Sequence, residues 1–356
     1  NLKEISNANF YIVCVPTPVT KSKIPDLKLL KSACLILSKV IKKNDFIVFE
    51  STVYPGTTEE ICIPLIKKYF LKKKKIKLSE NYFNFGYSPE RINPGDKKNI
   101  LRNVSKIVSG YDKTSLDFIS KVYSLVTKKI FKAKSIKIAE SAKIIENCQR
   151  DINIAFMNEL AIIFNKLNID FKEVLNAAST KWNFLNFKPG LVGGHCIGID
   201  PYYLAYKSKQ MDHNPEIILS GRKINDGMAK FYYKKIAYNL KKKFNKKNIK
   251  LLILGASFKE NVSDLRNSKA LEVVEFLKKD FKVHIYDHII SKQHLDQKFL
   301  VHYISKPVKN YYDCLILLVP HNLFASLKFQ KSARRYLKKE HLIFDIKQTL
   351  NKKIFK

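Results

Sequence analysis

The sequence contains no apolar run that approaches the roughly 18 to 20 residues that a helix needs to cross a bilayer. The run at residues 314–319 is only as long as a strand. A leader of the signal-peptide type is missing as well. These absences predict a soluble cytoplasmic protein that makes no contact with a membrane.

Paired cysteines are also missing. The cysteines are scattered through apolar segments, and none of them forms a Cys-x-x-Cys pair. This spacing argues against both a zinc site and a disulfide framework, so we expect no bound metal and a reducing compartment. The six cysteines are Cys14, Cys34, Cys62, Cys148, Cys196 and Cys314.

Acidic residues are scarce, because 31 Asp and Glu stand against 66 Lys and Arg, which gives a net charge of +35. Such an excess is typical of proteins that bind nucleic acid or an anionic surface. Here it consists mostly of lysine spread along the chain, as at 241–243 and 246–247, without the interleaved aromatic residues of a nucleic-acid module. We therefore expect solvated lysine faces and no nucleic-acid partner, although a basic field favours a substrate that carries a diphosphate.

Buried parallel strands are indicated in two parts of the chain. Apolar runs at 10–15 and 45–49 end abruptly in Pro-Thr-Pro and Glu-Ser-Thr, and helical patterns follow them. Between the two parts, residues 135–167 have the periodicity of one long helix. The second part has a predicted helix at 268–278 and predicted strands at 249–254, 282–286, 312–319 and 341–345.

This order of elements predicts an α/β protein with two doubly wound, Rossmann-like domains joined by a long central helical region. An apolar fraction of 46% over 356 residues is enough for cores of this size. We expect the first domain at 1–133, the central helical domain at 134–235 and the second Rossmann-like domain at 236–356.

Glycine gathers around one cysteine. Gly190, Gly193 and Gly194 precede Cys196 and Gly198 follows it, so the backbone can turn sharply and a ligand can approach closely. A histidine directly before the cysteine and an aspartate four residues after it are possible partners for proton transfer. A lone motif of this kind is more often a loop with an incidental core cysteine, so both interpretations stay open at this point.

Four polar residues recur at spacings of three and four along the predicted long helix: Glu140, Lys143, Asn147 and Arg150. Residues at this spacing share one face of a helix. The periodicity alone favours a solvated face and a functional surface equally.

The loop at 189–203 resembles the catalytic-cysteine loop of the UDP-glucose/UDP-mannosamine dehydrogenase family. The resemblance continues in chain order and covers nearly the whole chain. Its other segments are Val-Pro-Thr-Pro at 15–18, Glu-Ser-Thr-Val-Tyr-Pro-Gly at 50–56, Ser-Pro-Glu-Arg at 88–91, Lys143 to Arg150, Ile-Asn-Asp-Gly at 224–227, and Phe258 and Lys259 with Asp264 and Arg266.

The resemblance implies an NAD-dependent oxidoreductase that converts the C6 alcohol of a UDP-N-acetylhexosamine to a carboxylate, for the synthesis of surface polysaccharides. Cys196 would form a thiohemiacetal with the intermediate aldehyde and then a thioester, which water hydrolyses. The domain at 1–133 would then bind NAD, the domain at 134–235 would supply catalytic residues and dimerise, and the domain at 236–356 would bind the UDP-sugar. A homodimer or a higher homo-oligomer is also implied.

The site residues follow from the same resemblance, position by position. Catalytic roles are implied for Cys196, Lys143, Asn147, Asp200, Glu90 and Thr52. Contacts with NAD are implied for Val15, Pro16, Thr17, Thr52 and Arg266. Contacts with the UDP-sugar are implied for Glu90, Arg91, Lys143, Asn147, Arg150, Gly190, Gly193 and Lys259.

Two of these assignments have structural alternatives. Glu90 and Arg91 form an adjacent acid and base, which could be an ordinary exposed pair. Arg266 could be paired with Asp264 instead of reaching NAD.

The chain departs from the family because none of its 356 residues forms the Gly-x-Gly-x-x-Gly turn that holds a pyrophosphate at a helix N-terminus. We therefore expect a truncated first domain that has lost its first two βα units, which puts NAD binding in doubt. Pro94 stands where UDP-glucose enzymes usually have a second glutamate, which favours the acetamido-sugar branch. Residues 180–185 differ from the His-Pro-Arg segment of the mannosamine enzymes, so the chain is closest to enzymes that oxidise UDP-N-acetylglucosamine or UDP-N-acetylgalactosamine.

Three alternatives remain. The first is a truncated, inactive family member that only binds the UDP-sugar. The second is a different cysteine enzyme, such as a hydrolase with His195 as its base. The third is a nucleic-acid binder driven by charge, whose binding would depend steeply on salt.

Overall fold

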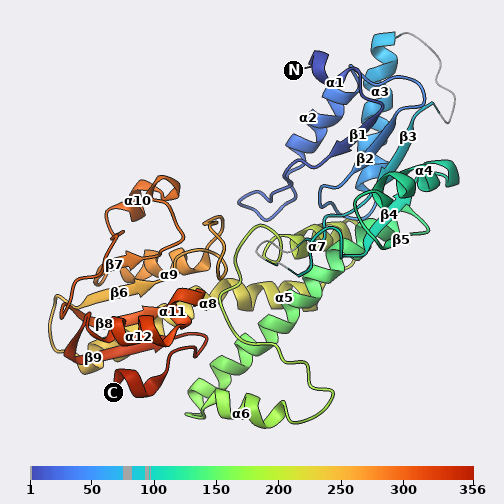
Figure 1. The fold of residues 1–356 in the computed structure, drawn as a ribbon. Coiled ribbons are helices and arrows are strands. Elements are labelled where there is room, and N and C mark those ends of the chain that lie inside the picture. Colours follow the sequence, from blue (N-terminus) through green and yellow to red (C-terminus); the bar gives the residue numbers. More distant parts are fainter. Residues whose placement is uncertain (1, 75–81, 93–95, 97) are drawn as a thin grey trace. The chain divides into compact units, whose positions relative to one another are not determined.

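The computed structural model describes residues 2–74, 82–92, 96 and 98–356. The chain forms two compact units, one of residues 1–149 with 199–219 and the other of residues 150–198 with 220–356. Two long helices, α5 (Ile136–Lys166) and α8 (Glu216–Lys243), contribute residues to both units (Figure 1). The long helix predicted at 135–167 is therefore confirmed.

The first unit contains a five-stranded sheet whose strands follow the order of the chain. Strands β1 to β3 are parallel, β3 and β4 are antiparallel, and β4 and β5 are parallel again. The carboxyl ends of β1, β2 and β3 therefore lie at one edge of the sheet. The strands are β1 (Phe10–Val13), β2 (Phe46–Phe49), β3 (Asn84–Tyr87), β4 (Lys106–Gly110) and β5 (Ile130–Lys132).

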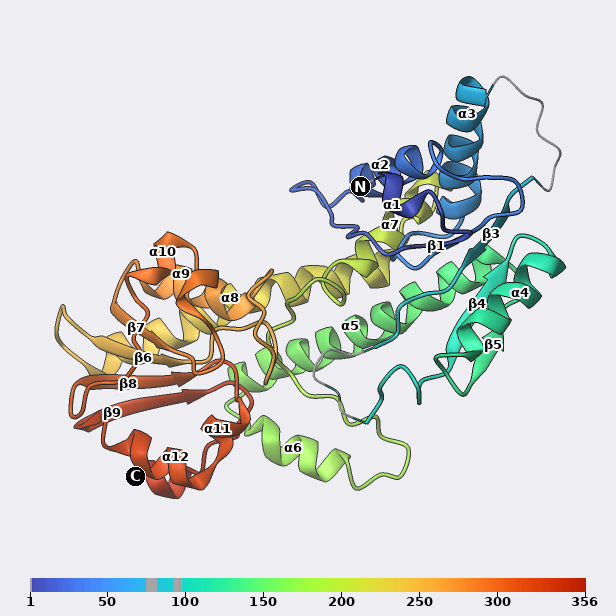
Figure 2. The same cartoon turned by 45° about the horizontal axis from the view of Figure 1, so that its top comes forward.

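Helices cover both faces of this sheet. One core joins β1 to β3 with α2, α3, α7 and the first turns of α5, and Ile47 and Phe49 are buried in it. Helix α4 packs on the other face, against Val48 and Val108, and lies alongside β4 and β5 (Figure 2). The helices are α1 (Leu2–Ile5), α2 (Lys28–Leu37), the π-helical turn η1 (Thr58–Cys62), α3 (Ile63–Lys74), α4 (Lys113–Ser124) and α7 (Asp200–Gln210).

The second unit contains a parallel four-stranded sheet of order β7-β6-β8-β9. The chain leaves β6 on one side to form β7 and then returns on the other side to form β8. Open sheets of this kind bind ligands beyond the strand ends at such a change of direction, so the loops after β6 and β8 flank the expected position. The strands are β6 (Lys250–Leu254), β7 (Lys282–Tyr286), β8 (Tyr312–Leu317) and β9 (Leu337–Asp345).

Two hydrophobic cores lie on the two faces of this second sheet, which confirms the doubly wound architecture. Gly255 directly follows β6 with a φ of +82°, and a side chain there would meet the carbonyl oxygen of Val319 at 2.4 Å. This glycine is therefore required by the close approach of the β8 loop. The helices are α6 (Phe171–Ala178), α9 (Lys269–Leu277), η2 (Lys292–His294), α10 (Gln297–Leu300), α11 (Asn322–Ala325), α12 (Leu327–Arg334) and η3 (Lys352–Phe355).

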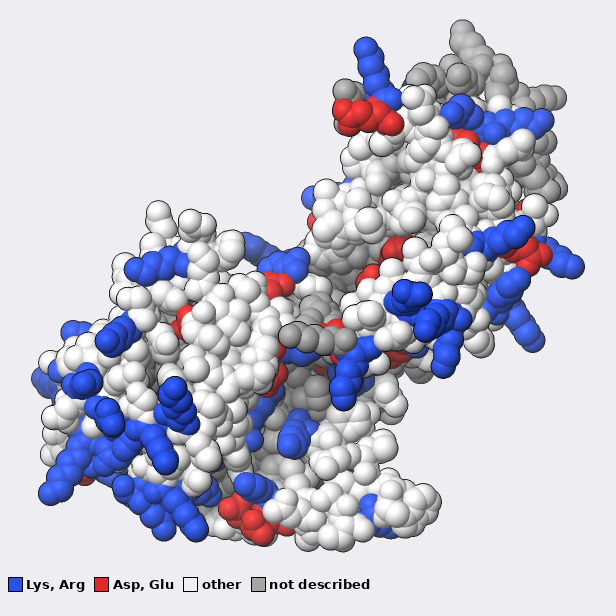
Figure 3. All heavy atoms as spheres, in the orientation of Figure 1, with Lys and Arg blue, Asp and Glu red and all other residues white. Residues whose placement is uncertain are grey.

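Lysine and arginine side chains are spread over the visible face of both units (Figure 3). Within the described part of the chain, no helix combines the length and the apolar composition needed to cross a membrane.

Candidate active site

A cation, an amide and a carboxylate meet in the first unit. Lys143 and Asn147 lie one turn apart on α5, and Asp200 is the first residue of α7. Nδ2 of Asn147 donates a hydrogen bond of 2.5 Å to Oδ2 of Asp200, whose side chain is only 2% exposed. Burial raises the pKa of Asp200 to about 6, although the charge of Lys143 and the hydrogen bond from Asn147 act in the opposite direction.

Glu140 ties α5 to the loop after β2. Its two carboxylate oxygens accept hydrogen bonds from the backbone N–H groups of Gly56 and Thr58, at 2.6 and 2.9 Å. Burial raises the pKa of Glu140 to about 7. Glu140, Lys143 and Asn147 are all buried, whereas Arg150 is exposed. A solvated face is therefore the wrong interpretation for three of the four residues in the polar stripe.

The loops that follow β1 and β2 are joined by short hydrogen bonds. The hydroxyl of Thr17 donates to the carbonyl of Thr52 at 2.6 Å, and the hydroxyl of Ser51 donates to the carbonyl of Val15 at 2.7 Å. Pro16 is exposed beside them. These residues form one wall at the carboxyl edge of two adjacent parallel strands.

The adjacent residues Glu90 and Arg91 form contacts with different partners. Arg91 pairs with Glu146 on α5 at 2.8 Å and donates to the carbonyl of Ser105 at 2.6 Å. Oε1 of the exposed Glu90 accepts the backbone N–H of Ile92 at 2.5 Å. Among the described residues, the structural alternative of a pair between Glu90 and Arg91 is therefore not found. Pro94 lies outside the described residues.

The second unit holds the cysteine loop. The half-buried Sγ of Cys196 lies 3.1 Å from Nδ1 of His195, and Nε2 of the same ring lies 3.8 Å from Oδ2 of Asp264. Arg266 donates hydrogen bonds to the same Oδ2 of Asp264, through Nε at 3.0 Å and Nη2 at 2.6 Å. The structure therefore contains the structural alternative for Arg266, which is a pair with Asp264.

The glycines of this loop let it dock on the segment 258–267. A side-chain carbon at Gly194, where φ is +85°, would lie 2.6 Å from the ring of Phe258. A side-chain carbon at Gly193 would lie 2.5 Å from the carbonyl oxygen of Asn267. The clearance that the sequence suggested for a ligand is therefore taken up by the protein's own packing at these two positions.

A pocket of about 390 Å³ opens at the carboxyl ends of β6, β8 and β9, the position expected from the sheet order. Gly190, an expected substrate residue, is part of its wall. Lys347 forms an ion pair with Glu260 at the pocket, and Lys188 adds a second cationic side chain. Lys259 precedes this glutamate and is half-buried. With two lysines and one glutamate in its wall, the pocket suits an anionic ligand.

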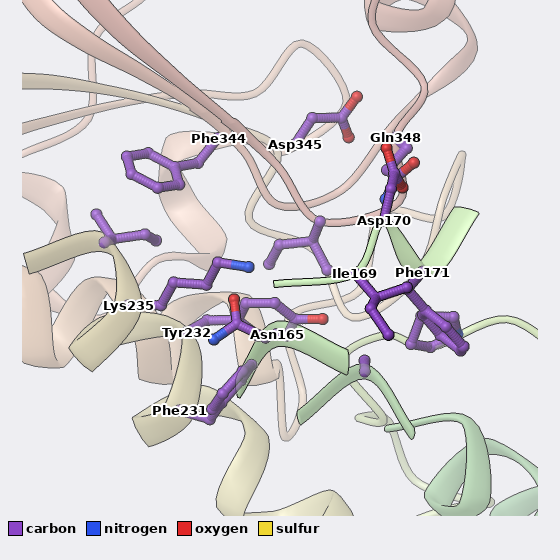
Figure 4. Close-up of a pocket in the computed structure, with 14 residues that line it drawn as sticks. Asn165, Ile169, Asp170, Phe171, Phe231, Tyr232, Lys235, Phe344, Asp345 and Gln348 are labelled. Carbon is purple, nitrogen blue, oxygen red and sulfur yellow. The ribbon is translucent and has the colours of Figure 1, made fainter. Parts of the chain in front are cut away.

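A smaller hollow of about 230 Å³ lies between the end of α5, α8 and the end of β9 (Figure 4). Its wall includes Phe231 and Tyr232, and the side chain of Lys235 points toward its interior in Figure 4. None of the expected site residues lines it. The pocket whose wall contains Gly190 is therefore the candidate for the substrate.

Models of the UDP-glucose/GDP-mannose dehydrogenase family match the chain in three parts. The NAD binding domain matches residues 1–127, the central domain matches residues 137–227, and the UDP binding domain matches residues 252–352. UDP-N-acetyl-D-glucosamine 6-dehydrogenase of Pseudomonas aeruginosa is 42% identical over 354 residues, which are 99% of this chain and 82% of that protein. The chain belongs to this family.

Other similarities agree with this membership. Protein CapL of Staphylococcus aureus is 46% identical over 358 residues, which are 99% of this chain and 82% of CapL. The structure of UDP-D-ManNAc dehydrogenase from Pyrococcus horikoshii superposes with a TM-score of 0.84 at 26% identity, over 99% of this chain and 80% of that one. These matches do not favour the alternative of an inactive protein that only binds a sugar nucleotide.

As a member of the family, the protein is an NAD-dependent dehydrogenase. Its NAD-binding match begins at residue 1, which gives no support to the expected loss of two opening βα units. The wall formed by Val15, Thr17 and Thr52 suits NAD, because it lies at the carboxyl ends of parallel strands and offers hydroxyl groups. The boundaries 1–133, 134–235 and 236–356 remain predictions.

The expected site residues divide between the two units. The first unit contains Val15, Pro16, Thr17, Thr52, Glu90, Arg91, Lys143, Asn147 and Asp200, and the second contains Arg150, Gly190, Gly193, Cys196, Lys259 and Arg266. The contact of Cys196 with His195 was absent from the expected catalytic set, although the adjacency of the two residues was a signal for it. Asp264 was named only as a partner of Arg266, and its approach to His195 has no signal in the sequence.

Proposed function

We propose that this dehydrogenase oxidises the C6 alcohol of a UDP-N-acetylhexosamine to a carboxylate, through a covalent bond to Cys196. The proposal is supported above all by the position of this thiol, which is half-buried beside a histidine on the loop whose Gly190 lines the nucleotide-sized pocket. A core cysteine would be fully enclosed, as Cys34 and Cys314 are.

The reaction has two oxidations and one hydrolysis. Bound NAD would supply the hydride acceptor for both oxidations. The first oxidation gives an aldehyde, and the thiolate of Cys196 attacks its carbon to form a thiohemiacetal. The second oxidation gives a thioester, whose C–S bond breaks when water attacks the carbonyl carbon. Sulfur suits this role because a thiolate is a good nucleophile and also leaves readily from an acyl group.

Lys143 and Asn147 would stabilise the negative oxygen that develops at each attack, through charge and a hydrogen bond. Asp200 would accept a proton and, with Glu90, activate the hydrolytic water. Its pKa of about 6 leaves it largely ionised at neutral pH, as an acceptor requires. Thr52 would hold a water molecule or the nicotinamide end of NAD.

The remaining expected residues would bind the two ligands. Val15, Pro16 and Thr17 would contact NAD at the edge of the first sheet, and Arg266 would contribute guanidinium N–H groups to the same cofactor. The sugar nucleotide would be bound by cationic side chains and by loop glycines, namely Arg91, Lys143, Asn147, Arg150, Gly190, Gly193 and Lys259. The positive charges suit a diphosphate.

The acetamido sugar is assigned from two observations. The relative from Pseudomonas aeruginosa acts on UDP-N-acetyl-D-glucosamine and is 42% identical. Residues 180–185 lack the His-Pro-Arg segment of the mannosamine enzymes. We therefore favour UDP-N-acetylglucosamine or its galacto epimer, with the uronic acid serving the synthesis of surface polysaccharides. Six free cysteines suit a reducing compartment, which supports the cytoplasm as the location.

A homodimer would cover an exposed apolar stripe on α5. Ile138, Ile145, Phe156 and Ile163 are exposed to 48, 56, 52 and 43%. Their spacings of seven and eleven residues place them on one side of the helix. Exposed apolar side chains that share one side of a helix are typical of an association site.

Cys196→Ser tests the covalent route. We expect the wild-type enzyme to form two NADH for each UDP-N-acetylglucosamine consumed, and the variant to form at least about 1,000-fold less uronic acid, because serine is not activated at neutral pH. Absorbance at 340 nm and mass spectrometry of the sugar nucleotide measure the two products. Cys14→Ser, which changes the exposed thiol of the first unit, is the matched control and should retain wild-type activity. Undiminished acid formation by Cys196→Ser would refute the covalent route.

A further inference from the structure

We propose that His195 is a further catalytic residue, which accepts the proton of the Cys196 thiol, and that Asp264 positions its ring for this transfer. The proposal rests on the proposed function, because it takes Cys196 as the nucleophile. It goes beyond that function because the implied catalytic set assigns no base to the thiol from within the cysteine loop.

The distances on the two sides of the imidazole ring carry the proposal. Sγ of Cys196 lies 3.1 Å from Nδ1 of His195, within hydrogen-bonding distance of a thiol. Nε2 lies 3.8 Å from Oδ2 of Asp264, a separation that suits an ion pair once the ring is protonated. A neutral imidazole accepts a proton at Nδ1 only when Nε2 carries the ring hydrogen. The carboxylate on the Nε2 side favours that tautomer.

The step is a single proton transfer. The S–H bond breaks, its electron pair stays on sulfur, and the proton forms a bond with Nδ1. The products are a thiolate and an imidazolium, and the imidazolium lies between two negative groups, the sulfur of Cys196 and the carboxylate of Asp264. A neighbouring histidine cation is one of the ways in which proteins hold a cysteine as thiolate near neutral pH.

The segment 258–267 fixes the position and charge of this arrangement. The ring of Phe258 lies 6.1 Å from that of His195, centroid to centroid. Arg266 binds Asp264 through Nε and Nη2, and this hydrogen bonding holds the pKa of Asp264 below its usual range. Asp264 is therefore a carboxylate over the whole range in which the thiol titrates. The pKa of Arg266 is raised by its hydrogen bond to Asp264 and also by the charge of Cys196. The guanidinium charge therefore favours the thiolate as well.

Helix α8 provides one further charged group close to the loop. A side-chain carbon at Gly198 would lie 3.8 Å from the guanidinium of Arg222. Arg222 forms ion pairs with Asp151 at 2.6 Å and with Asp226 at 2.5 Å. These two carboxylates offset its positive charge. Among the described residues, His195 lies within hydrogen-bonding distance of the sulfur and Arg266 interacts with its charge.

Asp200 is the competing candidate for the base. It lies in the first unit, where it accepts the hydrogen bond of Asn147 and faces the charge of Lys143. These contacts suit proton transfer at the oxygen of the substrate or at the hydrolytic water. His195 contacts the sulfur itself, so the two residues would act at different steps.

The test follows the reaction of Cys196 with iodoacetamide in the full chain, over about pH 5.5 to 9.5, by mass spectrometry of the peptide that contains it. Only the thiolate reacts, so the rate reports the thiolate population. We expect the wild-type rate to reach half its plateau well below about pH 8.5, the usual value for a thiol. In His195→Gln the midpoint should rise by at least about one pH unit, and the rate at pH 7 should fall about tenfold.

Asp264→Asn is the second variant. It keeps the imidazole but removes the carboxylate that orients it, so the midpoint should rise by less than in His195→Gln. The exposed Cys14 reacts in the same samples and should keep its wild-type rate in every folded variant. His213→Gln, a change of an exposed histidine after α7, should leave the profile of Cys196 as in the wild type.

An unshifted profile of Cys196 in His195→Gln, with Cys14 unchanged, would overturn the proposal. If circular dichroism shows that His195→Gln does not fold, the Asp264→Asn profile decides, and the absence of a shift there also overturns the proposal. Failure of the proposed function gives a different result, namely no uronic acid from the wild type while the alkylation profiles shift as expected. Normal acid formation with unshifted profiles would overturn the role of His195 alone.

Discussion

Asp200 is the buried carboxylate whose protonation state should limit turnover at low pH. Desolvation raises its pKa to about 6, because its side chain is only 2% exposed. The positive charge of Lys143 and the hydrogen bond from Asn147 favour the ionised form and keep the pKa from rising further. Asp200 is therefore mainly protonated below about pH 6 and mainly a carboxylate above it. Only the carboxylate can accept a proton, so the acid limb of the rate profile should lie near this value.

We predict that Asp200→Asn lowers kcat at pH 8 by about 100-fold or more, the usual effect of removing a general base. The wild-type kcat should fall as the pH is lowered through about 6, and this limb should vanish in the variant. Rates at saturating UDP-N-acetylglucosamine and NAD, measured from about pH 5 to 9, check both expectations. Asp212→Asn, at an exposed carboxylate just beyond α7, is the matched control. An unchanged acid limb in Asp200→Asn would show that another group causes it.

At the level of elements, Asn158 links α5 to the cysteine loop. Its Oδ1 accepts the backbone N–H of Gly190 at 2.8 Å, and its Nδ2 donates to the carbonyl of Gly190 at 3.0 Å. The same Nδ2 donates to Oδ1 of Asn225 on α8 at 2.8 Å, and Asn225 donates to Oδ1 of Asp151 at 2.7 Å. All three side chains are buried. Two helices thus hold the glycine that lines the candidate pocket.

We predict that Asn158→Ala raises the KM for the UDP-sugar about tenfold and leaves the KM for NAD unchanged, because it frees both backbone groups of Gly190. A tenfold change corresponds to about 1.4 kcal/mol, which lies within the range for a lost set of buried hydrogen bonds. Steady-state kinetics with each substrate varied in turn give the two constants. Equal rises in both constants would indicate general destabilisation instead.

Asn165→Ala is the control for this variant. Asn165 is an exposed amide near the end of the same helix, and it lines the smaller hollow instead of the candidate pocket. Both KM values should stay at the wild-type level. The free-energy change of the double variant Asn158→Ala/Asn225→Ala, calculated from the KM for the UDP-sugar, should be smaller than the sum of the changes in the two single variants. The reason is that the two amides share one hydrogen bond.

At the level of the whole molecule, strands with a marked apolar segment could be predicted, including the partly exposed β7 and β9, whereas the short strands β4 and β5 could not. The continuous apolar runs that became β2 and β8 have that pattern because helices cover both faces of these strands. Strand β1 has the same apolar pattern, but its Ile12 is 50% exposed. Strand β5 is only three residues long and largely exposed, so nothing in its sequence distinguishes it from a loop. The two compact units could not be predicted either, because α5 and α8 each contribute residues to both.

Candidate site residues could be named from the sequence where they lie within one short motif. The resemblance named Lys143, Asn147 and Asp200, but helical periodicity could not say that their common face is buried. The pair of Arg91 with Glu146 joins segments distant in the chain, and so does the approach of His195 to Asp264. Such contacts depend on tertiary packing, which spacing in the sequence does not determine.

The exposed stripe on α5 gives the prediction for the assembly. Ile138, Ile145, Phe156 and Ile163 would be covered by a second copy of the chain, because their apolar side chains gain free energy when removed from water. We predict that the wild type elutes with the mass of a dimer or a larger assembly, and that Phe156→Asp shifts it to the mass of one chain. Size-exclusion chromatography with light scattering measures the mass directly.

Asn165→Asp is the matched control, because it adds the same charge on the opposite side of α5, nine residues further along the helix. It should retain the wild-type mass, so that a loss of association in Phe156→Asp reports the stripe and not the added charge. Circular dichroism would confirm that both variants fold. A wild-type protein with the mass of one chain at micromolar concentration would show that the stripe is not an interface between copies, and an oligomer that survives in Phe156→Asp would place the interface elsewhere.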